Sequence, residues 1–186
     1  MFRDLENLHL LKFNNEKEIQ NYIDENSNIM NDLLSVGYYN QKYYTLLQQI
    51  TFDKCFYFQA CLNFDIRFSE FNYERNYISE EKVYKKLNPN DEAYILVFDD
   101  PSRGFIVNDN KINSKLKIIR NDYNYLMFDY LKLIENATEI HAMQSGFLDL
   151  INSYKLSKPK IFRHRYIRNY TDHFHNQGLN KIYEIY

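Results

Sequence analysis

A chain of 186 residues, 45% of them hydrophobic, is long enough to form one domain with a substantial core, and it contains no apolar run that could span a bilayer. The formal net charge of −2 gives the molecule as a whole no electrostatic attraction for nucleic acid. Two cysteines exclude a disulfide framework, and Asp4 and Glu6 interrupt any secretory signal, so we expect a soluble, cytoplasmic protein.

Glycine is scarce, with four residues against 18 tyrosines and 14 phenylalanines. The chain has no Walker loop, no glycine-rich dinucleotide fingerprint and no nucleophile elbow, because each of these needs glycines at fixed spacings. The aromatic residues accompany many Asn, Ile and Lys residues, which is typical of a biased composition. We therefore do not interpret them as a stacking platform for nucleic-acid bases.

The first half of the chain mixes short apolar clusters with helix signals. Residues 9–13 and 33–36 have the length of short strands, and residues 16–24 repeat apolar side chains at helical spacing. A second amphipathic helix is predicted over residues 80–87, with Ser79 as its N-terminal cap. Because no repeat or linker divides the sequence, we expect a single domain over residues 1–186.

The second half alternates strand-like and helix-like segments. Residues 93–98 form a continuous apolar run, which is typical of a strand buried on both faces of a parallel sheet, and residues 137–143 predict another buried strand. Further strands are predicted at residues 115–119 and 160–162, and further helices at residues 123–134 and 147–153. This order predicts an α/β fold, a Rossmann-like open parallel sheet with flanking helices.

Both buried strands lead into short polar turns. Residues 99–105 follow the first strand and contain Arg103, and residues 141–147 close the second strand and contain Ser145. Ligands of open parallel sheets bind at the carboxyl ends of the strands. The two turns are therefore the predicted working surface.

Arg103 and Ser145 suit a phosphate ligand, and each also has a purely structural interpretation. An arginine presents paired donors to phosphate oxygens, and a serine that opens a helix stands beside free backbone N–H groups. Alternatively, Arg103 pairs with Asp99 or Asp100, and Ser145 only caps its helix. The sequence leaves these interpretations open. Asp99 and Asp100 are neighbours on an extended chain and point in opposite directions, so we do not expect them to form a catalytic dyad.

Three further groups carry weaker signals. His141 lies near the end of its predicted strand, where it either faces the same edge or has a structural role. Residues 172–175 contain Asp-His-Phe-His but lack a third anchored ligand, so we predict no metal there. Residues 163–168 are basic and aromatic, as in some nucleic-acid contacts, but no recognition motif for RNA or DNA accompanies them.

Two segments resemble a known group of proteins. Residues 94–105 (Tyr-Ile-Leu-Val-Phe-Asp-Asp-Pro-Ser-Arg-Gly-Phe) and 134–151 (Ile-Glu-Asn-Ala-Thr-Glu-Ile-His-Ala-Met-Gln-Ser-Gly-Phe-Leu-Asp-Leu-Ile) resemble microbial and viral glycosyltransferase-like proteins. Those proteins are distantly similar to the GDP-fucose-dependent fucosyltransferases of the GT-B architecture. The resemblance runs over most of the chain and includes residues 64–71 and 162–166.

The resemblance implies that residues 88–186 are the nucleotide-sugar-binding half and that residues 1–87 are a remnant of the N-terminal half with connecting helices. It implies that Arg103 is the catalytic residue that neutralises the leaving diphosphate, without a metal or other cofactor. The implied donor-binding residues are the turn at Ser145, Gly146 and Phe147, with Asp129 for the guanine or ribose; Asp100, Arg103 and His141 complete the set.

The chain also departs from the family pattern. Phe98 stands where members often have histidine, Gln144 and Gly146 replace a more acidic or serine-rich turn, and no Gly-Leu-Gly-Asp loop is present near the start. We therefore expect a shortened member that binds a nucleotide sugar, GDP-linked by the resemblance, with a glycan or small molecule as acceptor.

The alternative function is a non-catalytic binding or assembly module that keeps the fold without transferase activity. Nucleic-acid binding through residues 163–168 ranks third. The oligomeric state, a homo-oligomer included, stays open.

Overall fold

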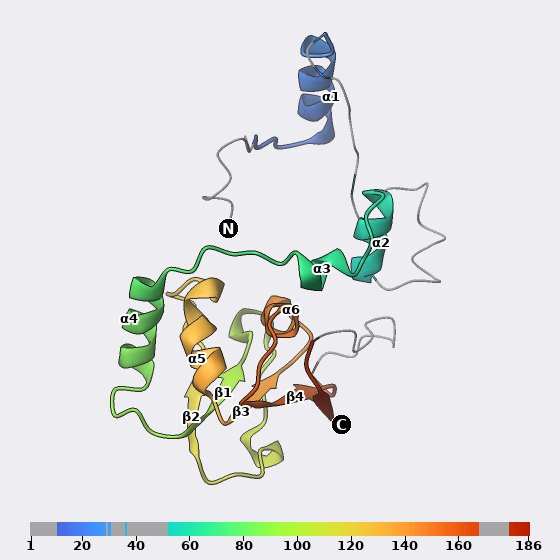
Figure 1. Cartoon of the computed structure of the whole chain (residues 1–186). Coiled ribbons are helices and arrows are strands. Elements are labelled where there is room, and N and C mark those ends of the chain that lie inside the picture. Colours follow the sequence, from blue (N-terminus) through green and yellow to red (C-terminus); the bar gives the residue numbers. More distant parts are fainter. Residues whose placement is uncertain (1–10, 29, 31–35, 37–51, 168–178) are drawn as a thin grey trace. The chain divides into compact units, whose positions relative to one another are not determined.

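A computed structural model describes residues 11–28, 30, 36, 52–167 and 179–186 (Figure 1). Its internal contacts form two compact units, Met1–Phe64 and Asp65–Tyr186. The strand predicted at 33–36 and part of the strand predicted at 9–13 lie outside the described residues, and residues 11–13 and 36 have no regular structure.

The described part of the first unit contains two α-helices. Helix α1 (Glu16–Glu25) confirms the predicted amphipathic helix, and its first turn is capped by Asn15, whose side-chain oxygen accepts a hydrogen bond from the Glu18 N–H at 3.1 Å. Helix α2 (Phe52–Gln59) lies in a stretch for which the sequence analysis predicts no element. None of the helices in the described ranges is both long and apolar enough to cross a membrane.

The second unit is built on a parallel sheet of five strands in the order β2-β1-β3-β4-β5 (Figure 1). This confirms the expected Rossmann-like α/β fold. The strands are β1 (Tyr94–Phe98), β2 (Lys117–Arg120), β3 (Glu139–Ala142), β4 (Lys160–His164) and β5 (Ile182–Ile185). The last of them, β5, was not predicted from the sequence.

The strand order changes direction once, between β1 and β3. The chain leaves β1 toward β2 on one side, whereas β3, β4 and β5 follow one another on the other side. Phe98 and Ala142 are register partners at the carboxyl ends of β1 and β3. Open sheets bind ligands at such a switch point, because the two connections diverge there and leave the strand ends accessible.

One face of the sheet is covered by helices. Helices α4 (Tyr77–Leu87), α5 (Leu131–Asn136) and α6 (Gly146–Ser153) contribute buried side chains to the core that includes Leu96 and Phe98 of β1 and Ile140 of β3. A short helix, α3 (Ile66–Ser69), precedes them in the chain. Burying these apolar side chains supplies the main favourable term in the folding of this unit.

Two predicted helices differ from the observed ones at their start. Helix α4 begins earlier than predicted, because Asn76 rather than Ser79 is its cap and accepts the Ser79 N–H at 3.1 Å. The helix predicted at 123–134 begins only with the 3₁₀ turn η5 (Met127–Tyr130), which continues into α5. The residues before η5 form a turn instead, because the Asp122 carboxylate accepts the Asn124 N–H at 2.9 Å.

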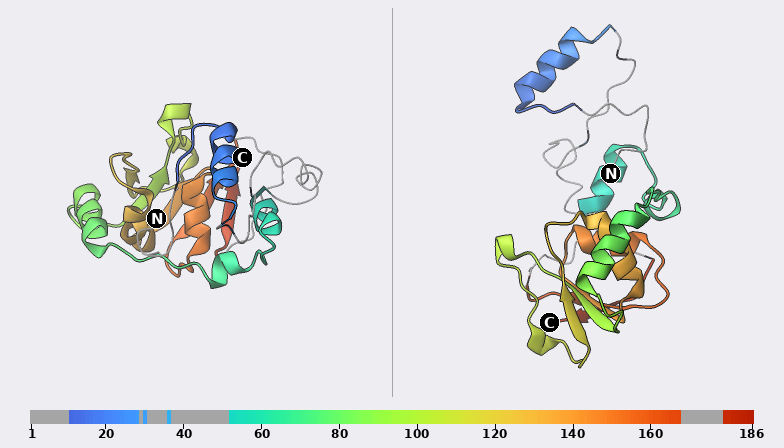
Figure 2. Two further views of the ribbon diagram at one scale, coloured as in Figure 1. Left: turned by 90° about the horizontal axis from the view of Figure 1, so that it is seen from above. Right: turned by 90° about the vertical axis from the view of Figure 1, so that its left-hand side faces the viewer.

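The opposite face is covered by the connection from β1 to β2, residues 99–116. This connection contains the two 3₁₀ turns η3 (Pro101–Arg103) and η4 (Asp109–Lys111) in place of an α-helix, and Figure 2 shows it in yellow-green. Its buried Val107 and Ile112 pack with Ile95 and Val97 of β1. With a small apolar contact and no helix, this connection depends on polar contacts to stay in place.

Candidate functional site

The two polar turns predicted as the working surface leave the sheet at neighbouring points. Phe98, the last residue of β1, stacks on Phe147 in the first turn of α6, with ring centroids 4.1 Å apart and planes 19° apart. The Tyr130 ring meets both of them edge-on, at 5.8 and 5.6 Å. This cluster holds the start of α6 against the end of β1. Phe147, expected to bind the donor, therefore has a packing role here.

Arg103 lies in the turn after β1 and pairs with Asp100 through its guanidinium group. Gly104 follows with a φ of +72°, a conformation that glycine adopts without strain, and lets the chain return so that Phe105 pairs with Asp100. The Arg103 side chain is 53% exposed and stands over the Phe105 ring. Of the two structural partners considered, Asp100 is the one observed.

Asp100 is mostly buried and accepts hydrogen bonds from two side chains of its own turn. The Ser102 hydroxyl donates to it at 2.6 Å, and Arg103 donates through Nε. These contacts hold the pKa of Asp100 below its usual value, and the hydrogen bond from Ser102 has the largest effect. Asp100 is therefore an anion at neutral pH and orients Arg103.

The turn after β3 leads into α6 and carries Ser145 at the N-cap position. The Ser145 hydroxyl donates to the Met143 carbonyl at 3.2 Å and makes no capping hydrogen bond. The expected structural role as a cap is thus not what the geometry shows. A Cβ added to Gly146 would lie 3.5 Å from the Met127 sulfur, so η5 packs beside this turn. Asp129, on the same 3₁₀ turn, is partly exposed.

Two further arginines contact this end of α6, and the sequence did not single them out as site residues. Arg163, at the carboxyl end of β4, donates to the Gln144 side chain at 3.4 Å and also pairs with Glu184 of β5. Arg67 of α3 pairs with Asp149 in the first turn of α6 at 3.3 Å. Their positions follow from tertiary contacts over 19 and 82 residues, so no local pattern could have revealed them.

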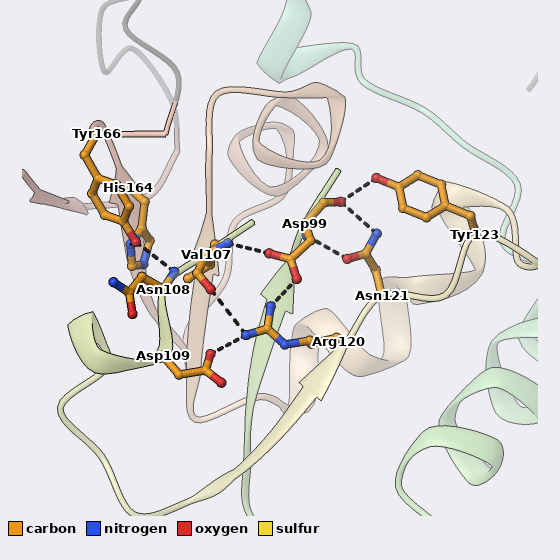
Figure 3. A network of polar contacts seen from close by, with 9 residues as sticks. All are labelled: Asp99, Val107, Asn108, Asp109, Arg120, Asn121, Tyr123, His164 and Tyr166. Atoms are coloured by element: carbon orange, nitrogen blue, oxygen red, sulfur yellow. Dashed lines mark hydrogen bonds and ion pairs between the residues drawn. The ribbon is translucent and has the colours of Figure 1, made fainter. Parts of the chain in front are cut away.

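Asp99 and Asp100 have different partners, as expected for neighbours on an extended chain. Asp99 fastens the β1–β2 connection (Figure 3). Its carboxylate accepts the Val107 N–H at 2.7 Å and pairs with Arg120, which in turn pairs with Asp109. Its backbone N–H donates to Asn121 at 2.7 Å. These contacts occupy both carboxylate oxygens, so Asp99 is a structural residue of the connection.

His141 does not face the two turns. It lies between Ile140 and Ala142, whose side chains belong to the helix-covered core, and so projects from the other face of β3. There it stacks on Phe162 and contacts His164 at 2.8 Å. Burial lowers the pKa of His141 to about 4. The structural interpretation of this histidine is the one the geometry favours.

Within the described ranges, no group of three or more His, Cys, Asp and Glu side chains could hold a metal ion. The Asp-His-Phe-His group at 172–175 lies outside these ranges. In the described part of the basic segment, Arg163 and Arg165 both pair with the carboxylate of Glu184.

Comparison with known proteins finds no match to this chain among protein-family models, curated proteins or solved structures.

Proposed function

We propose that the chain binds a nucleoside diphosphate sugar at the switch point between β1 and β3, as a glycosyltransferase-like protein. One observation carries the proposal: the exposed guanidinium of Arg103 and the Ser145–Gly146 turn follow two adjacent strands whose connections diverge. This placement is the general ligand position of open α/β sheets, and both groups suit phosphate oxygens. The resemblance to fucosyltransferase-like proteins suggests a GDP-linked donor.

Arg103 is available to a diphosphate at little cost. The Arg103 side of the ion pair with Asp100 is half exposed, so solvent screens that side of the pair, and a charge-assisted hydrogen bond to phosphate contributes about 1.5–3 kcal/mol. A bound diphosphate therefore displaces Asp100 from the guanidinium. In the transfer reaction Arg103 would stabilise the charge that develops on the leaving diphosphate.

The turn that opens α6 would hold the second part of the diphosphate. The backbone N–H groups of its first residues point toward the strand ends, at the positive end of the helix dipole, and Ser145 carries a hydroxyl beside them. Asp129 belongs to η5, whose Met127 packs beside Gly146, and would recognise the guanine or ribose. His141 has no part in this proposal, because it faces the opposite side of the sheet.

Isothermal titration calorimetry with GDP and GDP-fucose tests the proposal. Arg103→Ala should weaken binding roughly 10- to 100-fold, and Arg103→Lys should recover only part of the loss, since lysine lacks the paired donors. Asp100→Asn should tighten binding several-fold, because it releases Arg103 and removes a negative charge. Lys85→Ala, a 75% exposed lysine of α4, is the matched control and should change nothing.

Binding that is absent, or equal in the wild type and Arg103→Ala, would refute the proposal. Donor binding without hydrolysis or transfer, measured by release of GDP with candidate acceptors, would assign the chain to the alternative, a non-catalytic module. Activity that survives EDTA would agree with the expected independence from metal. A binding constant for oligonucleotides that falls steeply with salt would instead support the nucleic-acid alternative.

A further inference from the structure

On the sheet face opposite the helices, four titratable side chains form a continuous hydrogen-bonded row. His141 Nε2 lies 3.4 Å from the Glu139 carboxylate, and His141 Nδ1 lies 2.8 Å from His164 Nε2. His164 Nδ1 lies 3.1 Å from the Tyr166 hydroxyl, which also accepts the Asn108 backbone N–H at 2.9 Å. Both histidines are at most 2% exposed, whereas Tyr166 is 40% exposed. The row thus links the buried sheet face to the surface.

The positions of the protons in this row follow from counting. Only one hydrogen fits between the two imidazoles, because their facing nitrogens are 2.8 Å apart. In the neutral pair a second hydrogen faces the Glu139 carboxylate, on His141 Nε2, since a bare nitrogen there would repel the anion. His164 Nδ1 is then bare and accepts from the Tyr166 hydroxyl. The pair has a single vacant position for a further proton, at His164 Nδ1.

The charges around the pair favour the neutral form near neutral pH. Burial lowers the pKa of His141 and of His164 to about 4. His164 also feels the repulsion of a protonated His141 and of Lys111 in η4, and the opposing attraction of Asp99 after β1. The Glu139 carboxylate on β3 favours a proton on His141 Nε2, the nitrogen that faces it. One added proton is tolerated in this setting, and two are excluded by the short contact between the rings.

We propose that Glu139, His141, His164 and Tyr166 form a single-proton switch, in which one proton taken up at His164 Nδ1 reverses the Tyr166 hydroxyl that holds the β1–β2 connection at Asn108. The exposed hydroxyl passes its proton to His164 Nδ1 and regains one from the solvent, so the pair gains one proton. Afterwards the Tyr166 oxygen must accept from both His164 and Asn108. The Asn108 contact weakens as a result.

The switch controls the connection that covers this sheet face, and it is independent of the proposed function. Asn108 opens η4 by accepting the Asn110 N–H at 3.0 Å, so loosening Asn108 loosens the start of that turn. Asp99 and Arg120 hold the same connection at Val107 by contacts that involve no histidine. Acidification therefore loosens the connection first at Asn108, while the ion pair between Arg120 and Asp109 still holds η4.

Long-range ¹H–¹⁵N NMR of the full-length labelled chain tests the proton positions. At pH 7.5 both imidazoles should be Nε2–H tautomers, and titration toward pH 4 should add one proton, at His164 Nδ1. Hydrogen exchange, corrected for the intrinsic pH dependence of the rate, should show protection of the Asn108 amide falling several-fold with the same midpoint. An Nδ1–H tautomer of His164 at pH 7.5, a doubly charged folded pair, or Asn108 protection that ignores the titration would overturn the proposal.

Two tyrosine variants separate the switch from a general effect of acid. Tyr166→Phe keeps the ring and removes the hydroxyl, so protection of Asn108 should drop about fivefold at pH 7.5 and should no longer respond to the histidine titration. Tyr77→Phe, at a 68% exposed position on α4, is the matched control and should behave as the wild type. Unchanged protection of Asn108 in Tyr166→Phe would also refute the proposal.

Discussion

The buried histidine pair should make the second unit lose stability on mild acidification. Burial lowers the pKa of His141 and of His164 to about 4 in the folded state, whereas an exposed histidine titrates near 6.5. Between pH 6.5 and pH 4 the two histidines are therefore protonated in the unfolded chain but neutral in the folded chain. Stability is complete above pH 6.5 and is lost as the pH falls from there toward 4.

The magnitude follows from these two pKa values. One pKa unit corresponds to about 1.4 kcal/mol. Lowering the pH from 7 to 5 covers most of the interval between the unfolded pKa near 6.5 and the folded pKa of about 4. Each histidine then contributes about 2 kcal/mol, and the pair contributes up to about 4 kcal/mol. Glu184 adds little in this window. Burial opposes the charge of Glu184, but hydrogen bonds from Tyr186, Arg165 and Arg163 outweigh it and lower the pKa to about 2.

Urea unfolding followed by circular dichroism at pH 7 and pH 5 measures the loss. With a slope of about 2 kcal/mol per M urea, the midpoint should fall by roughly 1 to 2 M. His141→Gln removes one of the two groups, so the difference between its own two midpoints should be about half that of the wild type. Equal midpoints at the two pH values, or an unchanged difference in His141→Gln, would refute the reasoning.

Three substitutions test other contacts of the fold, each by thermal or urea unfolding. Arg75→Met should cost about 3–5 kcal/mol, because it leaves the fully buried carboxylate of Glu80 without its guanidinium partner, while Lys85→Ala should stay within about 0.5 kcal/mol. Asp99→Asn should cost about 2 kcal/mol and speed proteolysis within residues 105–116, and equal cleavage rates would contradict its role as a fastener. Phe147→Ala should cost about 3 kcal/mol, since the ring packs between two aromatic neighbours; a loss below 1 kcal/mol would argue against that contact.

Local sequence predicted much of the sheet but not its last strand. Residues 93–98 are apolar without a break and predicted β1 to within one residue, because a strand buried on both faces leaves that pattern. Residues 182–185 (Ile-Tyr-Glu-Ile) alternate over only four positions, too few for a period to stand out, and they pair with β4 at the sheet edge. The start of α4 was missed for a different reason: both Asn76 and Ser79 suit a cap, and the fold selected Asn76.

The candidate site, too, was predicted in part from the sequence and in part only seen in the structure. The sequence placed Arg103 and Ser145 after buried strands, at the carboxyl edge of the sheet, while it left Asp99 and Asp100 as equal partners for Arg103. The strand order that makes this edge a switch point came from the structure. Only the structure showed that Asp100 pairs with Arg103 and Asp99 with Arg120.

By itself, the sequence determined the α/β fold and the two turns, since hydrophobic runs and polar strand ends are local properties. The tertiary structure decided which charges meet. It brought Arg67 and Arg163 to the start of α6 and turned His141 toward His164 on the opposite face. Such contacts join residues far apart in the chain, and their energies depend on burial and geometry that exist only once the sheet has formed.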